Sequence, residues 1–398
     1  MSVFAMKRFY HRNFLVMVAA TLLAVAGGLG ESAQAQTRPK QLRPAASLPL
    51  TSFYDTRPLT PGKPGELIRS ETVNQYNIPY ELSALRILYH SRTTSGADVA
   101  VSGVVLIPDG KPPTGGWPVI AWAHDFRGAA RQCAPSLMKS LDGGPVLAMY
   151  ASLGYAVVAT DYAGLGADSG PPVVDMRSNA MDVMYSVPAA RAAVPQIGRK
   201  WIAVGPFEGA MAAIAIAEGQ ERDSDYMGSI ATSGLADAQE AYERIAQRTP
   251  SRMLVLASTV KTLFPEFAVS EMLKDAALPA YQRAAQKCIE DTDTGIAGDS
   301  LRAGWENNKF VKEFFDRNTP GQTRTRGPLL VISGETDSAI PVEMTEKSVA
   351  RMCKQGDRVE FLKYPNLDAS GVMGVSAADQ ISWIKARFAG DPAPSNCP

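Results

Sequence analysis

The stretch WIAVGPFEGAMAA, residues 201–213, decides the fold. An apolar run that is typical of a buried strand leads into G-P-F-E-G and then directly into an alanine-rich helical pattern. Gly205 and Gly209 flank the turn, because a strand and a helix that meet at such close range leave little room for side chains. The spacing is that of the G-x-S-x-G turn that presents a nucleophilic serine. Phe207 stands at its centre, however, and a phenyl ring cannot attack a carbonyl group.

Strand and helix patterns alternate on both sides of this turn. After strand-like residues 66–108, apolar runs are separated by helical patterns, and this alternation predicts an α/β fold with a mostly parallel sheet covered by helices on both faces. Pro188 should kink or interrupt one of the helices. We expect strands near 117–123, 155–160, 201–204, 227–232, 329–333 and 359–364, and helices near 145–153, 178–194, 342–353 and 377–388.

Residues 235–325 break the alternation. They indicate several helices joined by loops, and we expect them to form a helical cap, or lid, inserted into the sheet domain. The α/β core then comprises residues 66–234 and 326–390, and residues 391–398 form a C-terminal tail.

The first 35 residues have the features of a signal peptide. Basic residues at positions 7, 8 and 12 precede an apolar run from Phe14 to Val25, and Ala33-Gln34-Ala35 is a small-x-small cleavage site. The apolar run is shorter than the roughly 20 residues that span a membrane. We therefore predict a secreted or periplasmic protein with no stable membrane span after cleavage; an uncleaved anchor is the alternative. Residues 36–65 are rich in Pro, Thr, Arg and Gln and are predicted to be a flexible lead-in.

The composition and the short motifs exclude several classes of function. The chain has 398 residues, 45% of them hydrophobic and 20% charged, and a formal net charge of +0, whereas a nucleic-acid partner would require a basic face. No P-loop occurs, and Gly164-Leu165-Gly166 lacks the third spaced glycine of a dinucleotide site. The D-T-D-T-G run at 291–295 departs from a calcium loop, whose twelfth position would be Arg302. We predict no cofactor and no metal.

Four cysteines, at positions 133, 288, 353 and 397, give an even count, which favours two disulfides in an exported chain. Three pairings are open from the sequence itself. Zinc binding is not supported, because no pair has C-x-x-C spacing and only His90 and His124 follow the signal peptide.

Further segments resemble one family in the same order. They are H-D-F-R-G at 124–128 (the family has H-G-x-x-G), R-Q-C-A-P-S at 131–136, A-T-D-Y-A-G-L-G at 159–166, R-S-N-A-M-D-V at 177–183, I-S-G-E-T-D-S-A-I-P at 332–341 and Y-P-N-L-D-A-S-G-V-M-G at 364–374. Over roughly residues 95–390 the chain resembles the secretory lipase family, the lipase A type of the α/β-hydrolase superfamily, in which the fold carries a helical cap. The resemblance implies the disulfides Cys133–Cys288 and Cys353–Cys397.

The resemblance also identifies the positions of the catalytic triad. The order Ser, Asp, His of this fold reads here Phe207, Asp337 and Ala369, and only Asp337 matches the family. The family has D-H-S-G where this chain has D-A-S-G. No histidine follows His124, and that histidine is structural in the family, so no base for a serine nucleophile is evident. Loss of triad members lowers turnover by about a millionfold.

The donors of the oxyanion hole are expected to be backbone N–H groups near Asp125 and of Glu208. Both residues are carboxylates, which oppose a developing negative charge unless they are protonated or paired. Arg127 is a candidate partner; the alternative is a solvated rim of charges. An alternative source of acid–base chemistry is a group of carboxylates that converge on one cleft: Asp125, Glu208, Asp337 and Asp368.

Three hypotheses follow. The first is a catalytically impaired pseudoenzyme that binds a lipid-like or ester small molecule. The second is an active lipase or carboxylic ester hydrolase with a rearranged catalytic set. The third is an extracellular or envelope structural protein with an unknown protein partner. We predict that the ring of Phe207 partly plugs the pocket, and that Asp337 gains a hydrogen bond from a neighbouring backbone or hydroxyl group.

Overall fold

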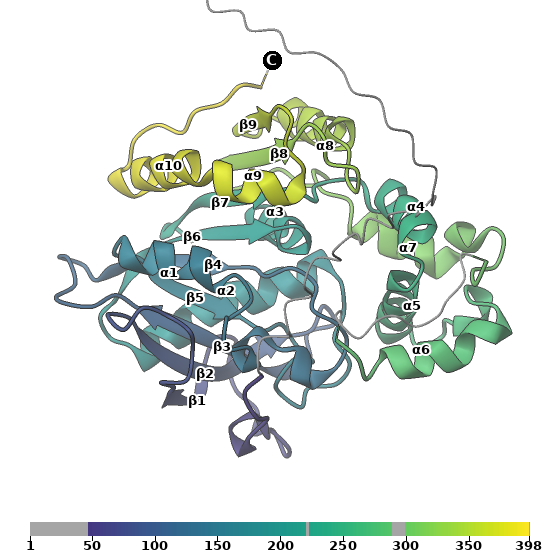
Figure 1. Cartoon of the computed structure of the whole chain (residues 1–398), viewed down its shortest axis with the longest axis horizontal. Helices are drawn as coiled ribbons and strands as arrows, with labels where there is room; N and C mark the ends of the chain where they lie inside the picture. The colour runs from purple at the N-terminus through teal and green to yellow at the C-terminus, as the bar shows by residue number, and fades with distance from the viewer. Residues whose placement is uncertain (1–46, 220–222, 289–298, 398) are drawn as a thin grey trace, which may run out of the picture. The chain divides into compact units, whose positions relative to one another are not determined.

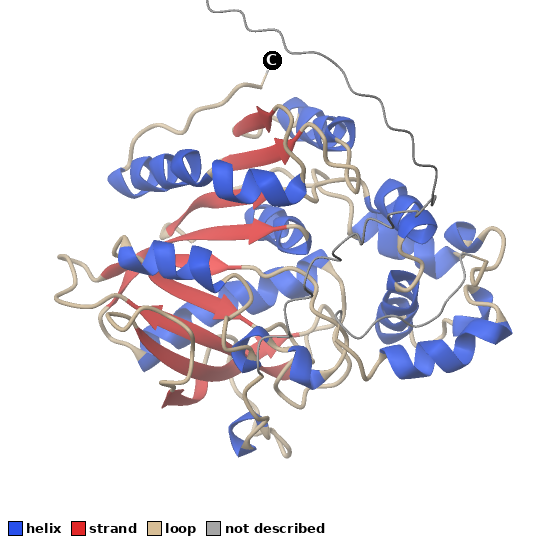
Figure 2. Cartoon of the chain, in the orientation of Figure 1, coloured by secondary structure: helices blue, strands red, loops and turns tan. Residues whose placement is uncertain are grey.

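A computed structural model describes residues 47–219, 223–288 and 299–397; the predicted signal peptide, the start of the lead-in and the run 291–295 lie outside them. In the described chain, nine strands form one sheet in the order β1-β2-β3-β5-β4-β6-β7-β8-β9 (Figures 1 and 2). The strands are β1 Leu67–Thr72, β2 Ser83–Arg92, β3 Asp98–Ile107, β4 Trp117–Trp122, β5 Ala156–Thr160, β6 Ile197–Pro206, β7 Tyr226–Thr232, β8 Leu329–Gly334 and β9 Val359–Tyr364.

Six of these strands run parallel. Strands β5, β4, β6, β7, β8 and β9 pair in parallel, whereas β1, β2 and β3 pair antiparallel with one another and β3 with β5. The predicted α/β fold with a mostly parallel sheet is therefore confirmed. The helices are α1 Gly144–Ser152, α2 Met176–Ala193, α3 Glu208–Gly219, α4 Ala238–Arg248, α5 Arg252–Leu263, α6 Leu278–Ala284, α7 Lys309–Arg317, α8 Val342–Lys354, α9 Ala369–Val375 and α10 Ala377–Ala389.

Short 3-10 helices occupy several connections. They are η1 Ser52–Tyr54, η2 Arg131–Cys133, η3 Pro135–Leu137, η4 Val269–Glu271, η5 Asp275–Ala277 and η7 Trp305–Asn307.

Both faces of the sheet are covered by helices. In β6, Ala203 belongs to a core shared with α2, α3 and α8, whereas its neighbour Ile202 belongs to a core shared with α1, α9 and α10. Successive side chains of a strand point to opposite faces, so a strand between two helical layers must be apolar throughout. Each fully buried aliphatic side chain contributes about 1.5–3 kcal/mol to this packing.

Helix α2 continues through Pro188, so the expected interruption does not occur. Asp175 caps the start of the helix by accepting a hydrogen bond of 2.8 Å from the N–H of Ser178. Val183 and Val187 are fully buried in the core that α2 shares with the sheet. An internal proline costs about 3 kcal/mol, and the apolar burial of this helix offsets that cost.

Residues 47–65, the described part of the predicted lead-in, contact the core of the sheet domain. Phe53 and Tyr54 are buried there, and the hydroxyl groups of Tyr54 and Ser136 lie 2.8 Å apart. The backbone N–H of Leu48 donates to the carbonyl of Leu137 at 2.6 Å. The segment is mostly loop, and two aromatic side chains bury enough apolar surface to hold it against the core.

Helices α4, α5, α6 and α7 form a group of their own, on the right of Figure 1. The chain leaves the sheet after β7, builds this group, and returns in the neighbouring strand β8. A separate apolar core holds the group together; its buried members include Leu254, Leu256, Val260, Phe267 and Phe314. The group therefore begins after the carboxyl end of β7, near the β9 edge of the sheet. The boundaries of a cap domain stay a prediction.

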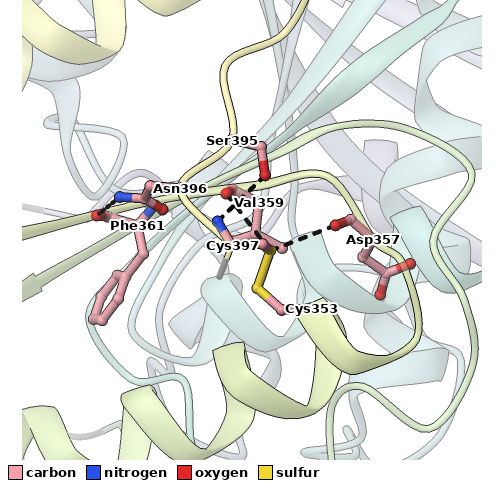
Figure 3. Close-up of a disulfide and its surroundings, with 7 residues drawn as sticks. All are labelled: Cys353, Asp357, Val359, Phe361, Ser395, Asn396 and Cys397. Atoms are coloured by element: carbon pink, nitrogen blue, oxygen red, sulfur yellow. Dashed lines mark hydrogen bonds between the residues drawn. A yellow bond between two sulfur atoms is a disulfide. The ribbon is translucent and has the colours of Figure 1, made fainter.

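Two disulfides are present, and they are the pairs that the family resemblance implies. Cys133–Cys288 links η2 to the chain that follows α6. Cys353–Cys397 links α8 to the C-terminal tail, which lies along the edge strand β9 (Figure 3). There the side chain of Asn396 accepts from the N–H of Phe361 and donates to its carbonyl, both at 2.8 Å. The tail thus covers part of an otherwise unpaired strand edge.

Candidate functional site

The parallel strands place the predicted site residues at one edge of the sheet. Each of these residues follows the carboxyl end of a strand, where ligands bind in open α/β sheets. A cavity of about 360 Å³, hereafter the main cavity, lies at this edge. Its lining includes Asp125, Phe207, Glu208, Asp337 and Ala369.

The turn after β6 has the sharp geometry that its glycines predict. Phe207 has a φ of 52°, a left-handed conformation that is uncommon for a bulky residue. A Cβ atom at Gly205 would lie 2.0 Å from the carbonyl oxygen of Gly209, and one at Gly209 would lie 2.0 Å from that of Ala123. Both positions therefore require glycine. Phe207 is half-buried and lines the main cavity; the predicted plugging by its ring stays a prediction.

The first backbone N–H of α3 has an internal partner. Oδ1 of Asp125 accepts a hydrogen bond of 3.3 Å from the N–H of Glu208. Oδ2 of Asp125 lies 3.5 Å from Nη2 of Arg127, whose Nε lies 2.7 Å from Oδ2 of Asp142. A carboxylate is stabilised at a helix N-terminus, since the N–H groups and the helix dipole both favour negative charge. The N–H group of Glu208 is therefore already engaged in a hydrogen bond with the carboxylate of Asp125.

The carboxyl group of Glu208 extends into a buried environment. Its Oε1 accepts a hydrogen bond of 2.8 Å from Nδ2 of Asn179 on α2. Burial and the nearby charge of Asp125 raise the pKa of Glu208 to about 8, although the charges of Arg252 and Arg127 and the bond from Asn179 act in the opposite direction. Glu208 is therefore mostly neutral at pH 7, which reduces the negative charge in the cavity wall.

Asp337 accepts hydrogen bonds from the backbone that follows it. Its Oδ1 accepts hydrogen bonds from the N–H groups of Ala339, at 2.8 Å, and Ile340, at 3.0 Å. The prediction of compensating backbone bonds is confirmed. Burial raises the pKa of Asp337, and these two bonds limit that rise.

Ala369 is the first residue of α9, a short helix that the sequence did not predict. Asp368 precedes it and caps the helix by accepting a hydrogen bond of 2.7 Å from the N–H of Gly371. Ala369 contributes only a methyl group to the wall of the main cavity. Asp368 is exposed and is not part of that lining, so it does not join the other three carboxyl groups there.

His124 lies behind the main cavity rather than in its wall. Its ring is fully buried, stacks on Tyr162 with centroids 4.1 Å apart, and contacts the backbone carbonyls of Asp125 and Asp161 through its two nitrogens. Burial lowers the pKa of His124 to about 4. A general base must reach the reacting proton, and this ring is held in packing and backbone contacts instead.

Sequence reasoning missed several polar residues of the main cavity: Asp175, Tyr242, Arg252 and Asn318. Asp175 directly precedes α2, and the family-like segment beginning at Arg177 was a signal for it. Arg252 follows Pro250 and Ser251, a helix-start pattern that places it in the first turn of α5. Apolar side chains complete the wall, among them Val174, Met176, Met211, Ile245, Val255, Leu256 and Phe314.

The described residues contain no group of three or more His, Cys, Asp or Glu side chains placed to hold a metal ion. Within the same residues, no helix combines the length and the apolarity that crossing a membrane requires.

The sequence model of the secretory lipase family matches residues 145–396 of this chain. The match begins at α1 and extends through the turn after β6 (hereafter the elbow turn), the inserted helices and α10. The chain belongs to the secretory lipase family. No curated protein matches it in sequence.

Solved structures of lipases and esterases share the fold of this secretory lipase family member. Candida antarctica lipase A has a TM-score of 0.75 and 17% identity, with 88% of this chain and 89% of that chain covered. The rice cell wall degrading esterase LipA from Xanthomonas oryzae has a TM-score of 0.68 and 16% identity, with 83% and 100% covered. At these identities the likeness establishes the α/β-hydrolase fold. Family membership and the two disulfides are consistent with an exported protein.

Proposed function

We propose that this secretory lipase family member binds a lipid-like or ester ligand in the main cavity and has lost ester hydrolysis. The inserted helices 235–325 would cover the ligand as a cap, and the protein would act outside the cytoplasm after export by residues 1–35. The observation that supports this most directly is the bond from the N–H of Glu208 to Oδ1 of Asp125. An ester oxyanion needs that N–H, and a fixed carboxylate both occupies it and repels the charge that would develop.

The triad positions support the same proposal. Phe207 supplies no nucleophile and Ala369 no base, and Asp337 has turned to backbone partners. The cavity itself remains, with a mostly apolar wall and a volume of about 360 Å³. Small-molecule sites are commonly apolar cavities of about 300–1,000 Å³, so retention of binding without chemistry is physically reasonable.

The test is hydrolysis of short- and medium-chain p-nitrophenyl esters by the mature protein and by the triple variant Phe207→Ser, Ala369→His, Asp125→Gly. We expect the natural protein to match buffer and the triple variant to turn over ester, because it regains nucleophile, base and a free oxyanion donor. The donor by itself is worth about 100-fold to 1,000-fold in kcat.

The matched control is the double variant Phe207→Ser, Asp125→Gly, which has a serine but no base. It should remain close to buffer, since a serine hydroxyl is a weak nucleophile without one. Ester hydrolysis by the natural protein well above buffer contradicts the proposal.

A second candidate is hydrolysis by a rearranged catalytic set, and one observation favours it. Glu208, with a pKa of about 8, holds a proton at neutral pH in the cavity, close to the carboxylate of Asp125. Two carboxyl groups in different environments can divide acid and base roles. If ester turnover occurs and Glu208→Gln abolishes it while Asp368→Asn does not, this second candidate replaces the first.

A further inference from the structure

A second cavity of about 260 Å³ adjoins the main cavity. The two share the wall residues Phe126, Ile245, Arg252, Val255 and Ala339. The residues that only the second cavity has are Arg248, Thr249 and Ser251, and Arg248 and Thr249 are exposed. The second cavity therefore lies between the surface and the main cavity. Among the described residues that line it, two are charged, the arginines Arg248 and Arg252.

The carboxyl groups of the main cavity already have partners within the protein. Asp125 accepts from the N–H of Glu208, and Asp337 from two backbone N–H groups. Oδ2 of Asp175 lies 2.9 Å from Nε of Arg317, and Glu208 accepts from Asn179. None of these four groups forms an ion pair with either arginine of the second cavity.

Arg252 forms no ion pair with any described residue, although its charge acts on Glu208. Among the described residues its guanidinium group forms no ion pair and no hydrogen bond, and it lies over the face of the Phe126 ring, 5.9 Å from the ring centroid. Arg248 donates one bond, from Nη2 to the hydroxyl of Ser338 at 3.0 Å. Arginine presents several donors in a planar fork that matches carboxylate and phosphate groups. The two residues thus have donors to spare at the boundary between the cavities.

We propose that the two cavities together bind an amphiphile with an anionic head group and an apolar chain, and that Arg252, assisted by Arg248, binds the head group. The chain extends along Val255, Leu256 and Phe314 into the main cavity. This inference rests on the proposed function, which retains lipid binding. It adds that the ligand is negatively charged and that Arg252 and Arg248 bind the charged group.

The arrangement explains why the charge lies where it does. A neutral ester would need no cation between the surface and the apolar wall, whereas a free acid must keep its charged end solvated or paired. Arg252 lies at that boundary, so a chain can enter the apolar cavity while the head group stays near the surface. A charge-assisted hydrogen bond is stronger than a neutral one, and it would distinguish an acid from its ester.

The experiment is calorimetric titration of the mature protein with dodecanoate, dodecyl phosphate, dodecanol and methyl dodecanoate, all below their micelle concentrations. We expect the two anions to bind more tightly than the two neutral ligands. Arg252→Met keeps an unbranched side chain but removes the charge, and it should weaken anion binding by about 10-fold to 100-fold and leave dodecanol unchanged. Arg248→Met should have a smaller effect of the same kind, because Arg248 is more exposed.

Lys261→Met is the matched control, since Lys261 lies on the same helix as Arg252, is exposed and lines neither cavity. It should not change any affinity. Equal binding of anions and neutral ligands, unaffected by Arg252→Met, overturns the head-group assignment while leaving lipid binding intact. No binding of any of the four ligands overturns the proposed function together with this inference. Preference between dodecanoate and dodecyl phosphate identifies the head group.

Discussion

Two buried polar regions of this protein differ in how completely their groups satisfy one another. The first, the Asp161 cluster, consists of Asp161, Ser102, Ser136, Tyr54 and Arg86. Asp161 accepts from the hydroxyl of Ser102 at 2.6 Å and from the N–H of Ser136 at 2.8 Å, and Nη2 of Arg86 donates to the carbonyl of Ser136 at 3.2 Å. The second region is the main cavity, where Arg252 lacks an anion and Glu208 lacks the charge it would have in water.

The difference separates structural from functional polarity. The Asp161 cluster joins β2, β3, η1, η3 and the residue that follows β5, and its hydrogen bonds are made within the protein, as stability requires of buried polar groups. The main cavity keeps its carboxyl groups paired but leaves a cation and an apolar space. Stability does not require an unpaired cation beside an empty apolar space. Substitutions in each of the two regions therefore test whether they differ.

The largest effect is expected in the Asp161 cluster. Asp161→Ala leaves the hydroxyls of Ser102 and Ser136 and one N–H group buried without their acceptor, and it should reduce the free energy of unfolding by about 3 kcal/mol. Denaturant unfolding measures this change. The control Asp168→Ala removes a carboxylate paired at the surface with Arg57 and should cost less than about 1 kcal/mol. Similar losses for the two variants would contradict the contrast.

An intermediate effect is expected from Glu208→Gln, and it should depend on pH. The folded protein holds a proton on Glu208 up to a pKa of about 8, whereas the unfolded chain releases it near the ordinary value of 4.5. Stability from this group is therefore fully present below about pH 4.5 and is lost as the pH rises towards 8. Glutamine does not titrate, so the variant should lose less stability between pH 5 and pH 8 than the natural protein.

Thermal unfolding at a series of pH values measures that slope. The matched control is Glu335→Gln, an exposed carboxylate just before Asp337, which should leave the slope unchanged. An unchanged slope in Glu208→Gln would mean that Glu208 ionises as it does in water, and the cavity would then resemble the surface rather than a buried region.

The smallest effect is expected from Asp125→Asn. The charge of Asp125 contributes to the raised pKa of Glu208, so removing the charge should bring that pKa down towards its ordinary value. The asparagine oxygen can still accept from the N–H of Glu208, and overall stability at pH 5 should change by less than about 1 kcal/mol. In the pH series described for Glu208, the loss of stability with rising pH should then end at a lower pH than in the natural protein. A shift to higher pH would contradict the assigned cause.

Sequence patterns predicted the sheet because each parallel strand is a short apolar run and each helix has an apolar face. The elbow turn was predicted from two glycines, whose lack of a side chain is a local requirement. Helix α9 was missed because it has seven residues, two of them glycine, and helix propensity does not favour it. Pro188 did not interrupt α2, since tertiary burial of that helix outweighed local preference.

By itself, the sequence determined the α/β fold and the family resemblance, and it predicted that Phe207 and Ala369 stand where the family has its catalytic serine and histidine. Only the tertiary structure decided that Asp125 accepts from the N–H of Glu208, because the two residues are 83 positions apart in the chain. It also decided the pKa of Glu208 and the position of Arg252 between two cavities. The physical reason is that hydrogen bonds and desolvation depend on distances across the fold, whereas strand and helix patterns depend on neighbours along the chain.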